Sequence, residues 1–126
     1  MSSLEVLIVE ADKDFADSVA EMLALDEHQV TVLASGEEAV ANYDGKAFDL
    51  VLLDIRLPGM SGLECLRAIR TINPIANVVI MTGVHTEQNR QEAKDSGALH
   101  VLQKPFDPLR LLELVKHNFS TSGNTT

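Results

Sequence analysis

Five short, mainly apolar, strand-like runs, spread along the whole chain, constrain the fold more than any other feature. They are rich in valine, leucine and isoleucine and cover residues 6–9, 30–33, 50–53, 78–81 and 99–102. The segments between them place apolar residues at helical spacing, as in Phe15, Val19, Met22 and Leu23. Strands that alternate with helices form βαβ units, so we expect an α/β fold with a parallel five-stranded sheet and helices on both faces.

Helix-start signals support this alternation. One precedes each predicted helix: Asp12 or Asp14, the capping boxes of residues 35–38 and 61–64, Thr86, and Asp107 before Pro108. The fourth predicted helix ends at Gly97.

The last two predicted helices have opposite apolar content. Between Glu87 and Ser96 the only apolar residue is Ala93, so this helix has little to bury and should be mobile or rest on a partner. The final helix has an excess of apolar residues: Leu109, Leu111, Leu112, Leu114 and Val115. This excess fits either a wide core-facing side or a contact surface.

Size and composition indicate one soluble domain over residues 1–119, followed by a polar tail or linker at residues 120–126. No apolar run approaches the roughly 20 residues of a membrane span. The net charge of −9 argues against direct nucleic-acid binding, which depends on cationic side chains. A single cysteine, Cys65, cannot form an internal disulfide, so we expect a cytoplasmic protein in which Cys65 packs rather than reacts.

Polar residues follow four of the five apolar runs. Glu10, Ala11 and Asp12 follow the first, Asp54 the third, Thr82-Gly83 the fourth and Lys104-Pro105 the fifth. Because the carboxyl ends of parallel strands lie at one edge of a sheet, these residues should face a common crevice. In isolation, Asp54 would more simply begin a turn; the whole set favours a site.

The side-chain chemistry of this set points to phosphoryl transfer. Clustered carboxylates attract a hard divalent cation such as Mg²⁺. Asp54 can then act as a nucleophile on phosphorus, with Lys104 and the Thr82 hydroxyl neutralising charge. Gly83, which lacks a side chain, leaves room for the phosphoryl group.

The span from about Leu4 to Phe119 resembles the receiver domain of bacterial two-component response regulators. The resemblance rests on residues 50–64 (Leu-Val-Leu-Leu-Asp-Ile-Arg-Leu-Pro-Gly-Met-Ser-Gly-Leu-Glu), 79–83 (Val-Ile-Met-Thr-Gly), 97–98 (Gly-Ala) and 104–106 (Lys-Pro-Phe). It implies a flavodoxin-like sheet with strand order 2-1-3-4-5 and a cis bond before Pro105. It also implies that Asp54 takes a phosphoryl group from a histidine kinase or phosphotransfer protein, with phosphate-contacting roles for Thr82 and Lys104.

The resemblance further implies a Mg²⁺ cofactor held by Glu10, Asp54 and the backbone carbonyl of Arg56, with Asp12 as a further candidate. Such a domain is not an enzyme with a separate substrate; it catalyses at most its own phosphorylation and dephosphorylation. Its output domain or partner protein would use the face of the fourth helix, fifth strand and fifth helix, with a homodimer as a further option and no membrane contact.

Two positions depart from the family pattern. Ala11 stands where the family has an acid that contacts the metal, so Mg²⁺ binding should be weak unless Glu10 or Asp12 reaches the ion; Asp12 fits a helix cap equally well. Val101 stands at the switch position, which usually holds Tyr or Phe, and its short, stiff side chain cannot swing. Arg56 lies where the family tunes phosphate lifetime, and its side chain either does so or points to solvent.

These departures support a rival interpretation, in which a degenerate receiver acts as a phosphorylation-independent interaction module. An enzyme with a separate substrate on the same scaffold is a third option, although no second catalytic constellation is visible in the sequence.

Overall fold

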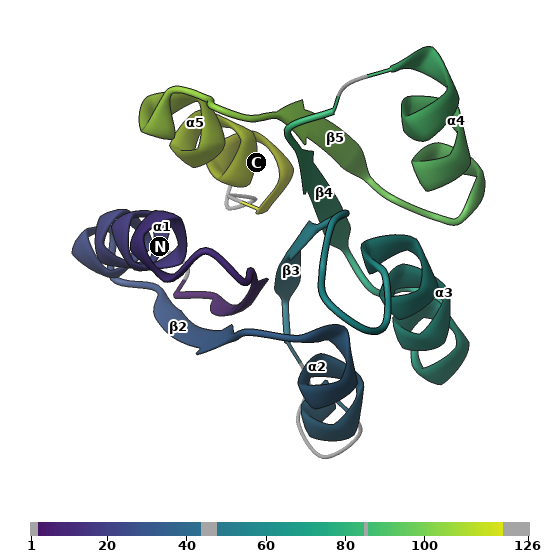
Figure 1. Ribbon diagram of the computed structural model, residues 1–126. Coiled ribbons are helices and arrows are strands. Elements are labelled where there is room, and N and C mark those ends of the chain that lie inside the picture. The colour runs from purple at the N-terminus through teal and green to yellow at the C-terminus, as the bar shows by residue number, and fades with distance from the viewer. Residues whose placement is uncertain (1–2, 44–47, 85, 120–126) are drawn as a thin grey trace.

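The computed structural model describes residues 3–43, 48–84 and 86–119. Its five strands form one parallel sheet in the order β2-β1-β3-β4-β5, which confirms the predicted topology (Figure 1). The strands are β1 (Glu5–Val9), β2 (Gln29–Leu33), β3 (Leu50–Asp54), β4 (Val78–Thr82) and β5 (His100–Gln103). Each lies within one residue of its predicted bounds. The predicted tail at residues 120–126 lies outside the described residues.

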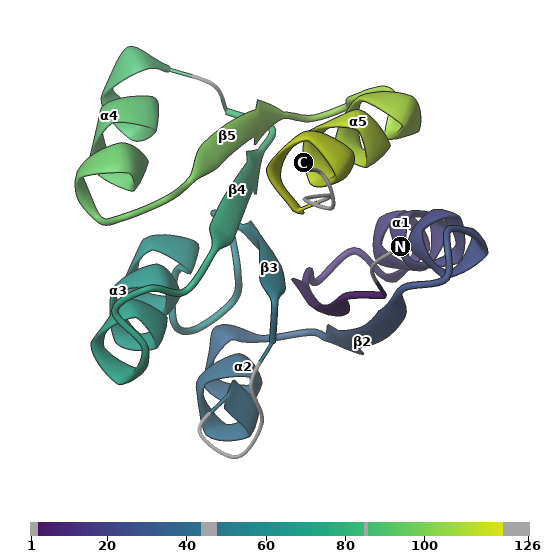
Figure 2. The same ribbon diagram turned by 180° about the vertical axis from the view of Figure 1, so that it is seen from behind.

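Helices cover both faces of the sheet (Figures 1 and 2). They are α1 (Lys13–Leu25), α2 (Gly36–Tyr43), α3 (Gly62–Ile72), α4 (Glu87–Asp95) and α5 (Pro108–Phe119). Buried residues of α1 and α5 pack on one face, and buried residues of α2, α3 and α4 pack on the other. None of the helices described is long and apolar enough to cross a membrane.

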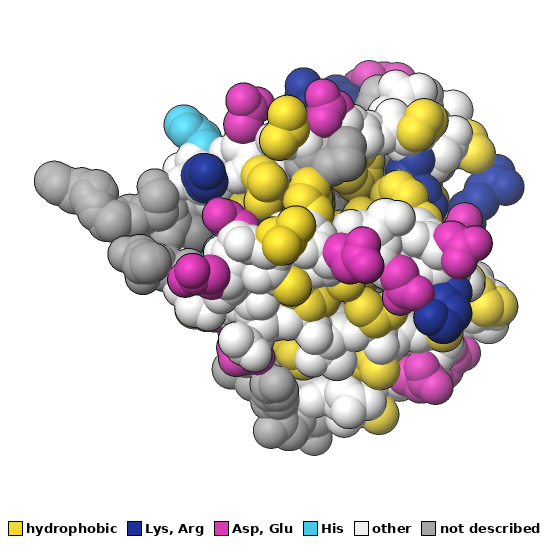
Figure 3. Space-filling model, turned by 90° about the vertical axis from the view of Figure 1, so that its left-hand side faces the viewer, with side chains coloured by type: hydrophobic (Ala, Val, Ile, Leu, Met, Phe, Trp, Pro, Cys, Tyr) yellow, Lys and Arg dark blue, Asp and Glu magenta, His cyan; other side chains and the backbone are white. Residues whose placement is uncertain are grey.

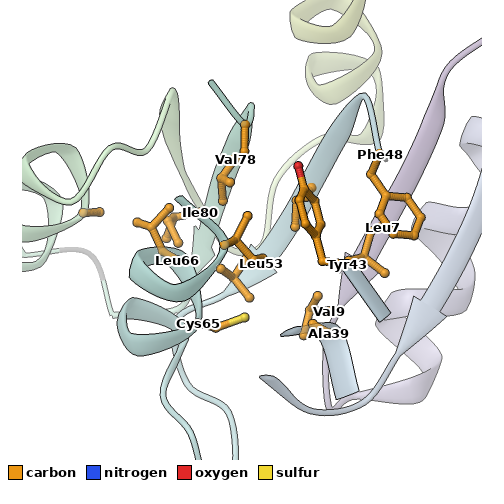
Figure 4. Packing of buried hydrophobic residues seen from close by; sticks show 14 residues of the cluster. Leu7, Val9, Ala39, Tyr43, Phe48, Leu53, Cys65, Leu66, Val78 and Ile80 are labelled. Carbon is orange, nitrogen blue, oxygen red and sulfur yellow. The ribbon is translucent and has the colours of Figure 1, made fainter. Parts of the chain in front are cut away.

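The central strands β3 and β4 are buried at every position, which explains their unbroken apolar runs. Successive side chains alternate between two cores: Leu53 and Ile80 pack beneath α2 and α3, and Leu52 and Met81 beneath α1 and α5. Figure 4 shows the first of these cores, with Leu53 and Ile80 near Leu66 and Cys65 of α3. This two-sided packing holds the carboxyl end of β3 rigidly.

Most predicted helix caps form as expected. Asp12, rather than Asp14, caps α1 by accepting from the N–H of Phe15. Residues 61–64 form a complete capping box at α3, and Thr86 caps α4. Asp107 accepts from the N–H of Leu109 at the start of α5.

The box at residues 35–38 forms only in part. Ser35 accepts from the N–H of Glu38, but the Glu38 carboxylate accepts from Ala34 instead of Ser35. The Glu38 carboxylate thereby accepts the hydrogen bond of a backbone N–H that lies just beyond the end of β2.

The last two helices bury their side chains as their composition predicts. Ala93 is the only buried residue of α4. In α5, Leu111 and Val115 are buried and Leu112 and Leu114 are partly buried against the core, while Leu109 is 64% exposed. The excess leucine therefore mostly serves the core.

Cys65 is fully buried, and the loss of hydration, together with the charge of Glu37, raises the pKa of its thiol to about 11. The expectation that it packs rather than reacts agrees with this burial.

Figure 3 views the side on which α1 lies in Figure 1, and the acidic side chains are scattered over this face rather than gathered in one patch.

Candidate functional site

The sheet brings Glu10, Asp54, Thr82 and Lys104 to one edge. Asp54 and Thr82 are the last residues of β3 and β4, while Glu10 and Lys104 directly follow β1 and β5. Parallel pairing aligns these ends: Asp54 lies opposite Met81, and Thr82 lies opposite Gln103. The backbone N–H of Lys104 also donates to the carbonyl of Thr82 at 2.7 Å. The strand ends therefore bring these residues to one edge of the sheet, as the sequence predicted.

Lys104 joins the two acids of this edge. Its Nζ lies 2.8 Å from Oε1 of Glu10 and 3.6 Å from Oδ2 of Asp54. The same ammonium lies 4.6 Å from the centre of the Phe15 ring, which provides a cation–π contact. Glu10 and Asp54 are only 3% and 5% exposed, so the three charges interact across a region with little water.

Burial and the neighbouring carboxylate set the ionisation of this site. Loss of hydration, followed by the hydrogen bond and charge of Glu10, raises the pKa of Asp54 from 3.8 to about 6. The N–H of Arg56, which donates to Oδ1 of Asp54 at 3.2 Å, and the charge of Lys104 oppose this rise. Burial alone would lower the pKa of Lys104, but its contacts with Glu10 and Asp54 together raise it. When both acids are ionised, the single ammonium of Lys104 balances only one of the two negative charges. The cluster then keeps a net negative charge.

The oxygen donors at this edge suit a hard cation such as Mg²⁺, but they are few. Asp54 and Glu10 supply carboxylates, and Ala11 supplies no side-chain oxygen. The Asp12 carboxylate caps α1, while its own N–H donates to Oε2 of Glu10 at 3.0 Å. Over the ranges that the structure describes, no group of three or more His, Cys, Asp or Glu side chains is arranged to hold a metal. These donors fit Mg²⁺ with water completing most of its shell.

The Thr82 hydroxyl is occupied within its own loop. Thr82 is fully buried, and its Oγ1 both donates to the carbonyl of Val84 and accepts from the N–H of Val84, each at 3.0 Å. A Cβ built at Gly83 would meet no atom within 4 Å, so this position has free space beside it. The Lys104–Pro105 bond is cis, as the resemblance implied. Val101 is half-buried and packs against the core beneath α2, α3 and α4.

Two residues that the sequence reasoning did not single out support Asp54. At Gly62 a Cβ would collide with the carbonyl oxygen of Asp54 and lie 2.5 Å from Cα of Ile55, so α3 starts directly against the Asp54 backbone. Glu37 accepts from the N–H of Met60, in the loop that follows Asp54, at 2.8 Å. The Ser-Gly pair at residues 61–62 could have indicated the role of Gly62. Nothing in the sequence indicated the contact between Glu37 and Met60.

Comparison with known proteins identifies relatives over nearly the whole chain. Residues 6–116 match the family described as "Response regulator receiver domain". The response regulator protein FleR of Pseudomonas aeruginosa is 36% identical over 111 residues, which cover 88% of this chain and 24% of FleR. The regulatory protein VanRB of Enterococcus faecalis is 34% identical and covers 96% of this chain, which spans 54% of VanRB. The chain thus corresponds to about a quarter to a half of these relatives.

A solved structure gives the same result. The receiver domain protein (CheY-like) of Methanospirillum hungatei is 31% identical and superimposes with a TM-score of 0.88, covering 93% of this chain and 94% of that one.

Proposed function

This chain belongs to the response regulator receiver family, and on that basis we propose that Asp54 is a phosphoacceptor in two-component signalling. In this proposal a histidine kinase or phosphotransfer protein supplies the phosphoryl group from a phosphohistidine. An Oδ atom of Asp54 attacks phosphorus, the P–O bond forms as the P–N bond breaks, and the released imidazole takes up a proton. Later attack by water on phosphorus breaks the bond to the Asp54 oxygen, releases inorganic phosphate and restores the carboxylate. In this proposal the domain catalyses at most its own phosphorylation and dephosphorylation.

The observation that carries this proposal is the Glu10–Lys104–Asp54 cluster. Asp54 stands on a strand buried on both faces, so its carboxylate is held in place before any reaction. The Lys104 ammonium already lies 3.6 Å from Oδ2 of Asp54 and can neutralise charge on the incoming phosphoryl oxygens. The Thr82 hydroxyl, on the neighbouring strand end, would turn from Val84 to bind one of those oxygens.

Mg²⁺ is the proposed cofactor, bound weakly by Asp54, Glu10 and the backbone carbonyl of Arg56. When bound, the ion supplies positive charge to the transferring phosphoryl group. Glu10 must loosen its contact with Lys104 to serve as a ligand, and Ala11 contributes nothing. Asp12 is the less favoured ligand because its carboxylate already caps α1. A receiver domain of the sensor histidine kinase PA1611 from Pseudomonas aeruginosa, 25% identical over 92% of this chain and 97% of that one with a TM-score of 0.84, is described with magnesium in its active site cleft.

The proposed output is a change of protein contacts in the cytoplasm. Helix α4 buries only Ala93, and Leu109 of α5 is exposed. The face formed by α4, β5 and α5 is therefore the proposed contact surface for an output domain, a partner protein or a second copy. The net charge of −9 supports contacts with protein rather than with nucleic acid.

The proposal is tested by mass spectrometry after incubation with phosphoramidate and millimolar MgCl₂. We expect the wild type to gain one phosphoryl group and Asp54→Asn to gain none. A wild type that takes no phosphoryl group, and that does not bind beryllofluoride, would refute the phosphoacceptor role.

A degenerate receiver that acts as a constitutive interaction module is the second candidate. Three observations favour it: Ala11 removes a ligand, Val101 cannot swing, and the Thr82 hydroxyl is engaged by Val84. This function predicts that Asp54→Asn binds its partner as tightly as the wild type does, and that beryllofluoride changes no NMR signal.

A further inference from the structure

We propose that Glu37, on α2, is a positioning residue for phosphoryl transfer at Asp54; this inference rests on the proposed function. It acts through the β3–α3 loop, residues 55–61, which carries Arg56. The N–H of Arg56 holds Oδ1 of Asp54, and the carbonyl of Arg56 is a proposed Mg²⁺ ligand. The position of this loop therefore decides how both groups meet the phosphoryl group.

The α3 end of the loop is fixed to the strand itself. The N–H of Gly62 donates to the carbonyl of Ile55 at 3.0 Å, and Gly62 lies against the Asp54 backbone too closely for any side chain. These contacts fix the two ends of the loop. They do not reach the bend between them, at Gly59 and Met60.

Glu37 fixes that bend from a neighbouring helix. Its Oε2 accepts from the N–H of Met60 at 2.8 Å, and it lies so close to Gly59 that a Cβ there would be 2.6 Å from it. Gly59 has a positive φ of 72°, so the bend needs glycine both for its backbone conformation and for the approach of Glu37. The Met60 side chain lies close over Gly36, where an added Cβ would be only 3.2 Å from its Sδ.

Arg56 thus lies between two anchored points of one short loop. Loss of the Glu37 contact would free the bend and let the Arg56 peptide reorient. The consequence should be larger in this chain than in a receiver with a full set of acids, because Ala11 leaves the Arg56 carbonyl as one of few metal-facing groups.

The adjacent acid provides a matched control. Glu38 is also exposed and lies in the same first turn of α2, and its carboxylate accepts a hydrogen bond from the backbone N–H of Ala34 rather than from the loop. Replacing either acid by alanine removes one charge near the same helix start, with a similar cost to α2. Only Glu37→Ala releases the loop.

The experiment compares wild type, Glu37→Ala, Glu37→Gln and Glu38→Ala in three measurements: the rate of phosphorylation by phosphoramidate, the Mg²⁺ affinity followed by NMR titration, and the melting temperature. We expect Glu37→Ala to be phosphorylated roughly threefold to tenfold more slowly and to bind Mg²⁺ more weakly by a similar factor, which is the net contribution of one typical hydrogen bond. Glu38→Ala should match the wild type in both. Glu37→Gln should recover most of the rate, because its amide oxygen can accept from Met60.

The outcomes separate the two proposals. Equal rates and equal Mg²⁺ affinities for Glu37→Ala and Glu38→Ala would overturn the role of Glu37 while leaving Asp54 as the phosphoacceptor. The role of Glu37 would also be overturned if the slower phosphorylation of Glu37→Ala were matched by a lower melting temperature and Glu37→Gln did not recover the rate. A wild type that takes no phosphoryl group would overturn both.

Discussion

Asp54 should reduce the stability of the protein at neutral pH, and replacing it with asparagine should make the protein more stable. In the unfolded chain its carboxyl group ionises near pH 3.8, whereas in the folded protein burial and Glu10 raise the pKa to about 6. Between these values the folded state holds a proton that the unfolded state has lost. The contribution of Asp54 to stability is therefore most favourable below about pH 4, falls as the pH rises through this window, and stays lower above it.

The size of the effect follows from the difference between the two pKa values. At about 1.4 kcal/mol for each pH unit, the rise from 3.8 to about 6 corresponds to about 3 kcal/mol at full ionisation. Asparagine has nearly the same shape but leaves an amide in a buried site and leaves Lys104 with Glu10 alone. We therefore expect Asp54→Asn to raise the free energy of unfolding at pH 7.5 by about 1–2 kcal/mol, and by much less at pH 4.

Urea denaturation followed by far-UV circular dichroism measures this difference, since the chain has no tryptophan to report by fluorescence. The series should run from pH 4 to pH 8 with a chelator present, because a bound cation would stabilise the ionised carboxylate. Asp17→Asn is the control: its carboxylate pairs with Lys13 at 2.7 Å on the exposed surface, where such pairs contribute little. An Asp54→Asn protein no more stable than the wild type at pH 7.5, or with the same pH dependence, would refute the reasoning.

Two further predictions concern the backbone and the cation. Gly62→Ala should lower the free energy of unfolding by about 2–4 kcal/mol, because its Cβ would collide with the Asp54 backbone, whereas Gly83→Ala should change it by less than about 0.5 kcal/mol; thermal denaturation of the pair checks both. If the two variants melted at the same temperature, the close approach of α3 to Asp54 would be wrong. Ala11→Asp should tighten Mg²⁺ binding by roughly tenfold or more in isothermal titration calorimetry, since it adds a carboxylate to a site with few donors. Unchanged affinity would mean that Glu10 or Asp12 already fills the missing position.

The fold could be predicted from the sequence because its main signals are local. An apolar run such as residues 50–53, bounded by turn residues, specifies a strand buried on both faces, and the capping box at residues 61–64 specifies where the next helix begins. Parallel strands place their ends at one edge, so Asp54, Thr82 and Lys104 can be grouped from the sequence alone. These inferences need only the order of the elements, not their exact separations.

The parts that could not be predicted depend on distances between elements. The contact of Glu37 with Met60 joins residues 23 positions apart and requires α2 to lie beside the β3–α3 loop. The choice of Asp12 as the cap of α1 depends on which carboxylate meets the N–H of Phe15. Likewise, a Cβ at Gly62 is excluded by the Asp54 backbone, which is a neighbour in space and not in sequence. Each of these decides how the site is supported rather than which residues form it.

In the proposed function, Val101 would shift the path of a signal from Asp54 toward Val84 and α4. In the proposed function the Thr82 hydroxyl must leave the Val84 carbonyl to reach a phosphoryl oxygen. That carbonyl would not be left unpaired, because Nδ2 of Asn89, on α4, donates to it at 3.0 Å as well. The cost of turning Thr82 is thereby reduced, and the Val84 backbone remains tied to α4 while its other partner leaves. Since α4 buries only Ala93, few contacts oppose its displacement. In the proposed function, turning Thr82 would release Val84, which stays bound to Asn89, and α4 could then move without an aromatic side chain at position 101.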